Sequence, residues 1–466
     1  MNIQLLWKLP VDQFNDWRRN NDLKQLFDHF EDVLPEFTQW RNTFSLSMEY
    51  ILSTDQPGKF FSGKHEKAIL QEDIEGFPKY IFVDLWRKQL KAELMRDQKG
   101  AIFFEPYICW EAKRKNKLRF IPGGLAGNRE DFMYGIYTDN SPELSQAILC
   151  TGFQVLKMGG VSLDGFIYLQ QKNLDFCNLD FLEIKGSGIS FSRQTEIYYA
   201  SVRYLDIEAK GQFFQFVKCQ FEKLQVHQSN LYGFTFEQCN IWGMDVRDSR
   251  LSDFTFRRSP MSLLNFVDVS IARWEFTPAN DGYGSGKGGA HESNAEIFKA
   301  LRILFQSNGM RREAAESYYG ERKHEMLATR HHLKFLSGFR SLSWGHRWYH
   351  IRFFKDQMAE TFTFIGAISS YVIWGFGERP GRVAISALVT ILIYAILFFS
   401  SDIAQASGNF FNSLYLSIVT FTTLGFGDIT PKDSSTISKM IVASEALFGA
   451  FMTGLFVAGY SNKSKY

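Results

Sequence analysis

The sequence is poor in cysteine and close to neutral in charge. Five cysteines in 466 residues are too few for a disulfide framework. A net charge of +2 argues neither for a nucleic-acid-binding protein nor for an acidic mimic of nucleic acid. The mean hydropathy of −0.19 limits any membrane-embedded part to a minority of the chain. The length predicts two or three domains.

The first residues lack the basic region and the long apolar core of a signal peptide. We therefore expect the N-terminus to stay in the cytoplasm. No apolar segment carries the ladder of arginines that a voltage sensor needs, so voltage gating is not expected.

Two long apolar runs stand near the end of the sequence, at 382–401 and at 439–460. Each is long enough to cross a bilayer as a helix. Basic residues precede the first run, and Lys463 and Lys465 follow the second, whereas acidic residues outnumber basic ones between the runs. The positive-inside rule then places both termini in the cytoplasm and the connection between the runs outside.

The connection between the two runs contains a short apolar helix, predicted over 410–422, followed by a glycine-rich string. The string reads Thr423-Leu424-Gly425-Phe426-Gly427-Asp428. The pattern Thr-x-Gly-x-Gly-Asp, after a short helix and between two spans, resembles the selectivity filter of the potassium channel family. A glycine-rich turn without function is the alternative, and the helix and spans around the string argue against it.

The resemblance implies a homotetramer in which rings of backbone carbonyl groups replace the water around a potassium ion. The ion-binding residues would be Thr423, Leu424, Gly425, Phe426 and Gly427. Gly425 and Gly427 can take left-handed conformations at no steric cost, which lets successive carbonyl groups face one axis. The Thr423 hydroxyl would add an innermost ring of ligands, and Asp428 would brace the loop beside the outer mouth. Phe426 replaces the more usual tyrosine, which removes one hydrogen bond around the filter.

Three residues of the second span stand out. Glu445 is ionisable within an apolar segment, which marks function by default, and it could support the filter from behind. Gly449 and Gly454 permit a bend, and by resemblance Gly449 is the better candidate for a gating hinge. The alternative is that both glycines allow close helix packing.

A period of five residues runs through 156–276. Its clearest part has an apolar residue at every fifth position: Phe216, Phe221, Val226, Leu231, Phe236, Ile241, Val246, Leu251, Phe256, Met261, Phe266 and Ile271. This period fits neither a helix nor a flat strand, but it fits a square coil with one side for each five residues. It resembles the pentapeptide repeat family, which forms a right-handed quadrilateral β-helix with four repeats per coil.

Some repeats depart from the family preference for a small residue and then Asp or Asn before the central apolar residue. Ser229-Asn230-Leu231 follows it, whereas Phe214-Gln215-Phe216 does not. Such bulky departures account for much of the phenylalanine content of 46. Cys219 and Cys239 are twenty residues apart and should stack in successive coils, as core packing rather than as a metal or redox pair. The ends of a solenoid need caps, and the N-terminal domain could provide one.

The region from 277 to 291 is rich in glycine and is predicted to be a linker. It does not match a phosphate-binding loop, because Asp281 stands where that motif needs glycine and Gly288 where it needs serine or threonine. A helical connector is predicted from 292 to 380, with one helix ending at Asn308-Gly309 and the next beginning near Arg311.

Two further features of the connector bear on its placement and chemistry. Phe362 to Phe376 is apolar but short for a span, and we expect an interfacial helix on the inner leaflet. His324, His331 and His332 do not form a zinc motif, because Ala328 stands where a second histidine is required, and they are expected at the surface.

Residues 1–155 resemble no family and are predicted to form a mixed α/β domain. Trp17 to Trp40 and Tyr80 to Leu94 have helical spacing, whereas Ala101 to Phe104 and Leu118 to Ile121 are typical of strands. A sensor for a ligand is a second interpretation of this domain.

The sequence thus predicts a multidomain protein. Its parts are a mixed α/β domain (1–155), a right-handed quadrilateral β-helix (156–276), a linker (277–291), a helical connector with an interfacial helix (292–380) and an all-α two-span pore domain with a re-entrant pore loop (381–466). The predicted function is a potassium-selective, homotetrameric channel subunit, gated by its cytosolic N-terminal domains and located in the plasma or inner membrane. It is not expected to be an enzyme.

The expected partners are other copies of the chain, the lipid bilayer and an unidentified cytosolic ligand or protein at the N-terminal domain. No nucleic acid, no cofactor and no metal other than K⁺ is expected. An inhibitor of DNA enzymes is an alternative that needs a strongly acidic solenoid, but acids only slightly outnumber bases in 156–276. A second alternative makes the N-terminal domain an enzyme or a second-messenger receptor that drives the pore.

Overall fold

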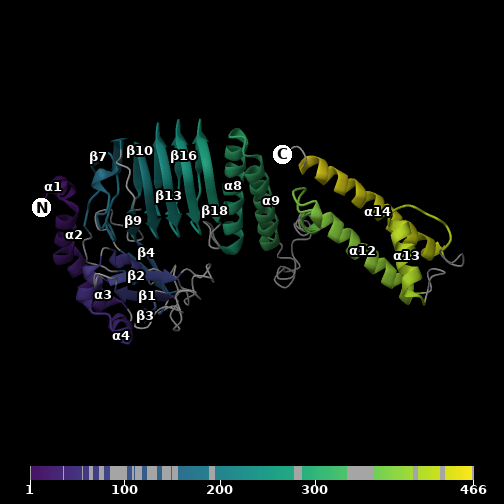
Figure 1. The fold of residues 1–466 in the computed structure, drawn as a ribbon, viewed down its shortest axis with the longest axis horizontal. Coiled ribbons are helices and arrows are strands. Elements are labelled where there is room, and N and C mark those ends of the chain that lie inside the picture. The colour runs from purple at the N-terminus through teal and green to yellow at the C-terminus, as the bar shows by residue number, and fades with distance from the viewer. Residues whose placement is uncertain are drawn as a thin grey trace, which may run out of the picture. The chain divides into compact units, whose positions relative to one another are not determined.

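The structure is a computed structural model that divides into two compact units, Met1–Tyr283 and Gly284–Tyr466 (Figure 1). Each unit is described by itself. The structure describes residues 2–34, 36–54, 56–61, 67–72, 78–83, 102–107, 110, 118–122, 134–138, 148–149, 156–187, 195–277, 286–332, 361–401, 408–430 and 436–463.

The first unit begins with short helices. They are α1 (Ile3–Lys8), α2 (Val11–Asn20), α3 (Asp22–Val33), α4 (Phe37–Thr43), α5 (Met48–Ser53) and the 3₁₀ helix η1 (Pro57–Phe60). Helical spacing over Trp17 to Trp40 is confirmed, but it is divided among α2, α3 and α4. The apolar faces of α3 and α4 meet in one core, where the rings of Phe30 and Phe37 lie 6.3 Å apart.

Two small antiparallel sheets follow the helices, so the N-terminal region is mixed α/β as predicted. One sheet has the order β2-β1-β3 and the other β4-β5-β6. Their bounds are β1 (Lys67–Glu72), β2 (Pro78–Val83), β3 (Ile102–Phe104), β4 (Leu118–Pro122), β5 (Tyr134–Thr138) and β6 (Ile148–Leu149). The helix predicted from Tyr80 is wrong at its start, because Tyr80 pairs with Leu70 in β2–β1. The rest of that prediction lies outside the described residues.

A parallel β-solenoid makes up the rest of the first unit. Its elements are β7 (Ser162–Asp164), η2 (Phe166–Tyr168), β8 (Leu182–Ser187), β9 (Thr195–Tyr198), β10 (Tyr204–Val217), β11 (Gln220–Phe221), β12 (Lys223–His227), β13 (Asn230–Glu237), β14 (Asn240–Ile241), β15 (Met244–Arg247), β16 (Arg250–Arg257), β17 (Leu264–Val267) and β18 (Ser270–Thr277).

Strands of successive coils pair twenty residues apart, as Leu231 does with Leu251 and Leu251 with Ile271. Twenty residues are four pentapeptides, so the predicted four-repeat coil is confirmed. Residues with a left-handed backbone recur at intervals of five or ten residues along the coils: Gln228, Gln238, Asp248, Asp253, Arg258, Leu263, Asp268 and Arg273. Before β10 the register is irregular, since Leu205 pairs with Leu182 and with Leu224.

Stacked aromatic rings fill the bore of the solenoid. Phe216, Phe236 and Phe256 lie above one another with ring centroids 5.5 Å and 4.9 Å apart. A parallel column runs through Phe234 and Phe254, whose rings are 5.2 Å apart. Phenylalanine therefore replaces the smaller residues of a regular repeat, because each ring packs on the ring one coil away. Cys219 and Cys239 are buried and free.

The N-terminal helices cap the first coil, as predicted. Arg18 of α2 is completely buried and donates to the backbone carbonyl oxygens of Asn173 and Asp175, at 2.6 Å and 2.9 Å. The carboxylate of Asp22, 2.6 Å away, balances the positive charge of Arg18. Trp7 Nε1 donates to the carbonyl oxygen of Met158 at 3.0 Å. These bonds satisfy carbonyl groups that would otherwise end the solenoid unpaired.

The second unit begins with the antiparallel helix pair α8 (Gly286–Ser307) and α9 (Arg311–His332). The turn at Asn308–Gly309 is where the sequence predicts it. α8 starts at Gly286, inside the predicted linker. His324 is buried, contrary to the prediction, with its Nδ1 3.1 Å from Nδ1 of His291 on α8. The side chains of His331 and His332 lie outside the described residues.

Three helices form the C-terminal part: α12 (Gly381–Ser400), α13 (Phe410–Phe421) and α14 (Thr436–Lys463). α12 and α14 are long and apolar enough to cross a membrane, in agreement with the two predicted spans. A shorter apolar helix, Thr361–Ile373, precedes α12. Phe398 of α12 and Leu416 of α13 pack with Ile441 and Val442 of α14. Helix α13 therefore packs against both α12 and α14.

Candidate functional site

The glycine-rich loop is positioned by α13. The side chain of Asn409 caps the start of this helix by accepting from the backbone N–H groups of Phe411 and Asn412. Leu416, Val419 and Phe421 are buried, which fixes the helix against its neighbours. Thr423 N donates to Thr420 O and Leu424 N donates to Val419 O, both at 3.0 Å. The loop therefore leaves the helix in one defined direction.

The backbone of the loop alternates in handedness. Thr423, Gly425 and Gly427 have φ values of 57°, 55° and 75°, in the left-handed region, whereas Leu424 and Phe426 do not. This alternation is the one expected where successive carbonyl groups face a common axis. Glycine adopts it freely, but Thr423 does so at a cost of about 1–2 kcal/mol. A strained residue at the start of such a loop marks a functional constraint.

The Thr423 side chain is free to act as an acceptor. Its hydroxyl donates to the carbonyl oxygen of Thr422 at 2.7 Å. Because a hydroxyl has one proton and two lone pairs, the lone pairs stay available to a cation. The C-terminal end of α13 adds its dipole at the same place, which favours positive charge.

The loop has little cover within one chain. Leu424 and Phe426 are 61% and 66% exposed, although both are large and apolar. At the other end of the loop, Tyr415 of α13 lies within hydrogen-bonding reach of Asp428. Asp428 is thus tied to the helix that carries the loop. Exposed apolar side chains on a loop between two candidate spans call for further surfaces to cover them.

Glu445 connects the three helices. It is completely buried on α14 and hydrogen-bonds to the hydroxyl of Ser417 on α13. The same hydroxyl also contacts the carbonyl oxygen of Ile391 on α12, at 2.9 Å. The Ser417 hydroxyl has one proton and can donate to only one of these oxygens. When it donates to the carbonyl oxygen of Ile391, its contact with Glu445 needs a proton on the carboxyl group. The geometry therefore fits a neutral, protonated Glu445.

The two glycines of α14 have different surroundings. A Cβ atom on Gly449 would lie 1.9 Å from the carbonyl oxygen of Phe421, at the point where α13 passes into the loop. A Cβ atom on Gly454 would meet nothing within 4 Å. Gly449 thus serves close packing between α14 and the end of α13. The hinge role of either glycine stays a prediction.

The helix Thr361–Ile373 has an exposed apolar stripe. Phe362, Ile365, Ile368 and Val372 are between 39% and 66% exposed and recur at helical spacing. A short helix with such a stripe is typical of a segment that lies in the membrane interface. The interfacial placement of 362–376 remains a prediction that this pattern supports.

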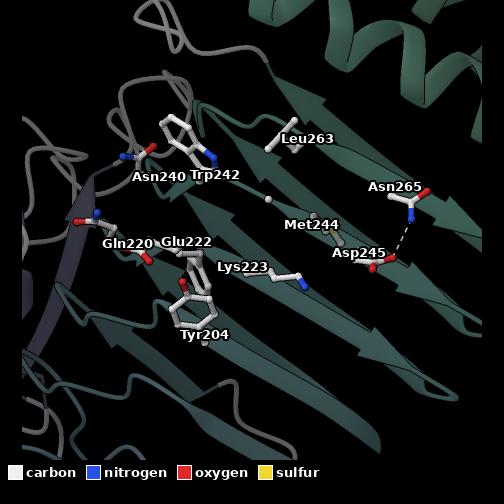
Figure 2. A pocket seen from close by; sticks show the side chains of 12 residues that line it. Tyr204, Gln220, Glu222, Lys223, Asn240, Trp242, Met244, Asp245, Leu263 and Asn265 are labelled. Carbon is white, nitrogen blue, oxygen red and sulfur yellow. Dashed lines mark hydrogen bonds between the residues drawn. The ribbon is translucent and has the colours of Figure 1, made fainter.

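A groove of about 610 Å³ lies on the side of the solenoid (Figure 2). Tyr204, Trp242 and Leu263 border it with large exposed side chains. Glu222, Lys223 and Asp245 add both signs of charge, and Asp245 accepts from Asn265 at 3.0 Å. This mixture selects for no single class of ligand. Among the residues that the structure describes, no three His, Cys, Asp or Glu side chains could hold a metal ion.

Sequence reasoning found the loop but missed Ser417, the partner of Glu445. The signal for it was weak, because a serine in an apolar helix is common. The solenoid groove was also missed. Its signal is the presence of large aromatic and aliphatic residues at outward positions of the repeat, namely Tyr204, Trp242 and Leu263.

Comparison with known proteins places the C-terminal part in context. Residues 386–463 match the ion channel family Ion_trans_2. Over 84 residues the chain is 33% identical to a hyperpolarization-activated voltage-gated potassium channel of Methanocaldococcus jannaschii; the matched segment is 17% of this chain and 38% of the relative. No solved structure matches the chain. Residues 386–463 therefore form a two-span, pore-loop segment of the ion channel type, joined here to a pentapeptide-repeat β-solenoid.

Proposed function

We propose that the protein is a potassium-selective channel subunit that conducts K⁺ through the loop Thr423–Gly427. The observation that carries the proposal is the alternating backbone of that loop behind a short helix between two spans. Carbonyl groups that face one axis replace the hydration shell of a dehydrated potassium ion. The potassium channel that the C-terminal segment resembles supports the choice of ion.

The same geometry favours a homotetramer. One chain supplies one loop, and a ring of carbonyl ligands needs several copies around an axis. The exposed Leu424 and Phe426, together with the exposed apolar faces of α12 and α14, supply surfaces for neighbouring copies and for lipid. Asp428 and Glu445 support the loop, and no enzyme activity or cofactor is part of the proposal.

The proposed placement follows the charge pattern of the sequence. Both termini lie in the cytoplasm, the loop faces the outside, and the protein resides in the plasma or inner membrane. The solenoid unit and the α8–α9 pair are then cytosolic and precede the first span, so gating is exerted from the N-terminal side. An unidentified cytosolic ligand or protein would supply the stimulus there.

The proposal is tested with the full chain reconstituted in liposomes. The reversal potential is measured with K⁺ on one side and Na⁺ on the other, for the wild type and for Gly425→Ala. A Cβ atom at φ 55° costs about 1–2 kcal/mol in each copy and disturbs the carbonyl ring. We expect strong K⁺ preference in the wild type and loss of conduction or of preference in the variant.

Gly454→Ala is the matched control, because its Cβ atom has open space. It should retain K⁺ preference. Equal permeability to K⁺ and Na⁺ in the wild type would contradict a potassium filter. Equal behaviour of Gly425→Ala and the wild type would show that ions do not pass through this loop.

A further inference from the structure

A side chain of the connector contacts residues at and just before the start of α12. Tyr319 of α9 lies among Tyr371, Phe376, Arg379 and Arg382, and these five residues are called the Tyr319 junction below. All five lie in the second unit. Neither the ion channel match at 386–463 nor the sequence pattern points to them.

Two arginines bind the Tyr319 ring. The guanidinium carbon of Arg379 is 4.2 Å from the ring centroid, and that of Arg382 is 5.7 Å from it. Arg382 also donates to the Tyr319 hydroxyl at 3.3 Å and to the carbonyl oxygen of Tyr371 at 2.8 Å. Since a cation over an aromatic face is attracted to it, the ring holds both guanidinium groups at once.

The turn before α12 has a left-handed backbone and is strained at Phe376. Gly375, Phe376 and Gly377 have φ values of 59°, 55° and 90°, three left-handed residues in succession. Phe376, unlike glycine, adopts this backbone conformation at a steric cost. Its ring lies 6.2 Å from that of Tyr319 and 5.9 Å from that of Tyr371. Ring contacts thus hold a residue that would otherwise relax.

The same turn touches the second span. A Cβ atom on Gly459 of α14 would lie 3.2 Å from Cβ of Pro380, the residue directly before α12. Trp374, just before the turn, packs in a cluster with Met452 and Leu455 of α14. A displacement of the turn therefore moves the starting end of α12 and the final part of α14 together.

We propose that Tyr319 couples the α8–α9 connector to the two spans. The proposal rests on the proposed function, and it names the contact through which the cytosolic part acts on the pore. When α9 moves, the Tyr319 ring moves with it and displaces Arg379 and Arg382. The turn before α12 then transmits this displacement to α14. Tyr319 is a positioning residue, since it lies outside the ion path that the loop forms.

The test uses full-chain variants in liposomes and measures K⁺ flux and K⁺ preference over Na⁺. Tyr319→Ala removes the ring and both guanidinium contacts, so flux should change about fivefold or more, as the loss of two cation–π contacts implies. K⁺ preference should stay unchanged. Tyr319→Phe keeps the ring and should remain within about twofold of the wild type. Tyr318→Ala is the matched control, because Tyr318 faces Arg302 of α8 instead.

A wild-type flux in Tyr319→Ala, or an equal change in Tyr318→Ala, overturns the coupling but leaves the pore proposal intact. If neither the wild type nor any variant conducts, the pore proposal fails, and amide hydrogen exchange on the same proteins decides the junction. Faster exchange in the last turns of α14 in Tyr319→Ala, and not in Tyr318→Ala, supports the junction. Equal exchange in both variants overturns it.

Discussion

The capped end of the solenoid and the loop-bearing helices each bury an ionisable side chain, but they satisfy it differently. Arg18 is surrounded by Asp22 and by the carbonyl oxygens of Asn173 and Asp175, all from its own chain. Glu445 has Ser417 as its partner, and its second oxygen is buried with no partner among the described residues. Within the described residues, the polar contacts of Arg18 are complete and those of Glu445 are not.

Apolar surface shows the same difference. In the solenoid, Phe236 and Phe256 are almost completely buried by stacking along the chain. In the pore segment, which comprises α12, α13, the loop and α14, Ile385, Leu388 and Phe426 are more than 60% exposed. The first unit thus buries its large aromatic surface within one chain, whereas the pore segment leaves apolar surface that lipid and other copies would cover under the proposed function.

The largest effect is expected at the capped end of the solenoid. Arg18→Met leaves two buried carbonyl groups and the partly buried Asp22 without their partner, which should destabilise this end by about 3–5 kcal/mol. Arg19→Met is the matched control, because Arg19 pairs at the surface with Asp16 and should cost at most about 1 kcal/mol. Amide hydrogen exchange over residues 3–60 measures both. Equal exchange in the two variants would break the contrast between the two regions.

Glu445 should respond to the shape of its side chain rather than to its charge. Glu445→Gln keeps a donor for Ser417 and should preserve assembly and K⁺ flux. Glu445→Ala leaves Ser417 with one partner and opens a cavity between three helices, at a cost of about 2–4 kcal/mol. Thermal unfolding of the assembled protein in detergent, together with flux, measures the difference. A loss of flux in Glu445→Gln as large as in Glu445→Ala would show that the ionised carboxylate is required.

Much of this contrast was predictable from the sequence, because periodic patterns predict local structure well. The step of five gave the solenoid, and the apolar runs around Thr423–Asp428 gave the spans, the short helix and the loop. Contacts between distant segments were not predictable. Nothing in the sequence marks Arg18, whereas Tyr80 is predicted in a helix and His324 at the surface. For Arg18 and His324, packing against a segment far along the chain decides the outcome, and Tyr80 instead pairs with the neighbouring strand β1.

The glycines of α14 offer a smaller test of packing within the pore segment. Gly449→Ala forces a methyl group against the carbonyl oxygen of Phe421, and the shift should cost about 1–3 kcal/mol and disturb the loop directly beyond it. Gly454→Ala should stabilise α14 by up to about 1 kcal/mol, since alanine is the better helix former. Thermal unfolding and flux separate the two. If instead Gly454→Ala abolishes gating while Gly449→Ala is tolerated, the hinge lies at Gly454.

The smallest effect is expected at the α8–α9 pair, where a buried ionisable group faces a group of like charge. Burial, and then the neighbouring His291 and Lys323, lower the pKa of His324 to about 4 from its ordinary value of 6.5. Because the folded pKa lies below the unfolded one, only the unfolded state takes up a proton as the pH falls from 6.5 towards 4. The free energy of unfolding should therefore fall by about 1–2 kcal/mol between pH 6.5 and pH 5. His324→Gln has no such proton to take up and should lose this part of the acid sensitivity. Amide hydrogen exchange of α8 and α9 at pH-corrected rates provides the measurement, and parallel slopes in the two proteins would mean that His324 is protonated in the folded state.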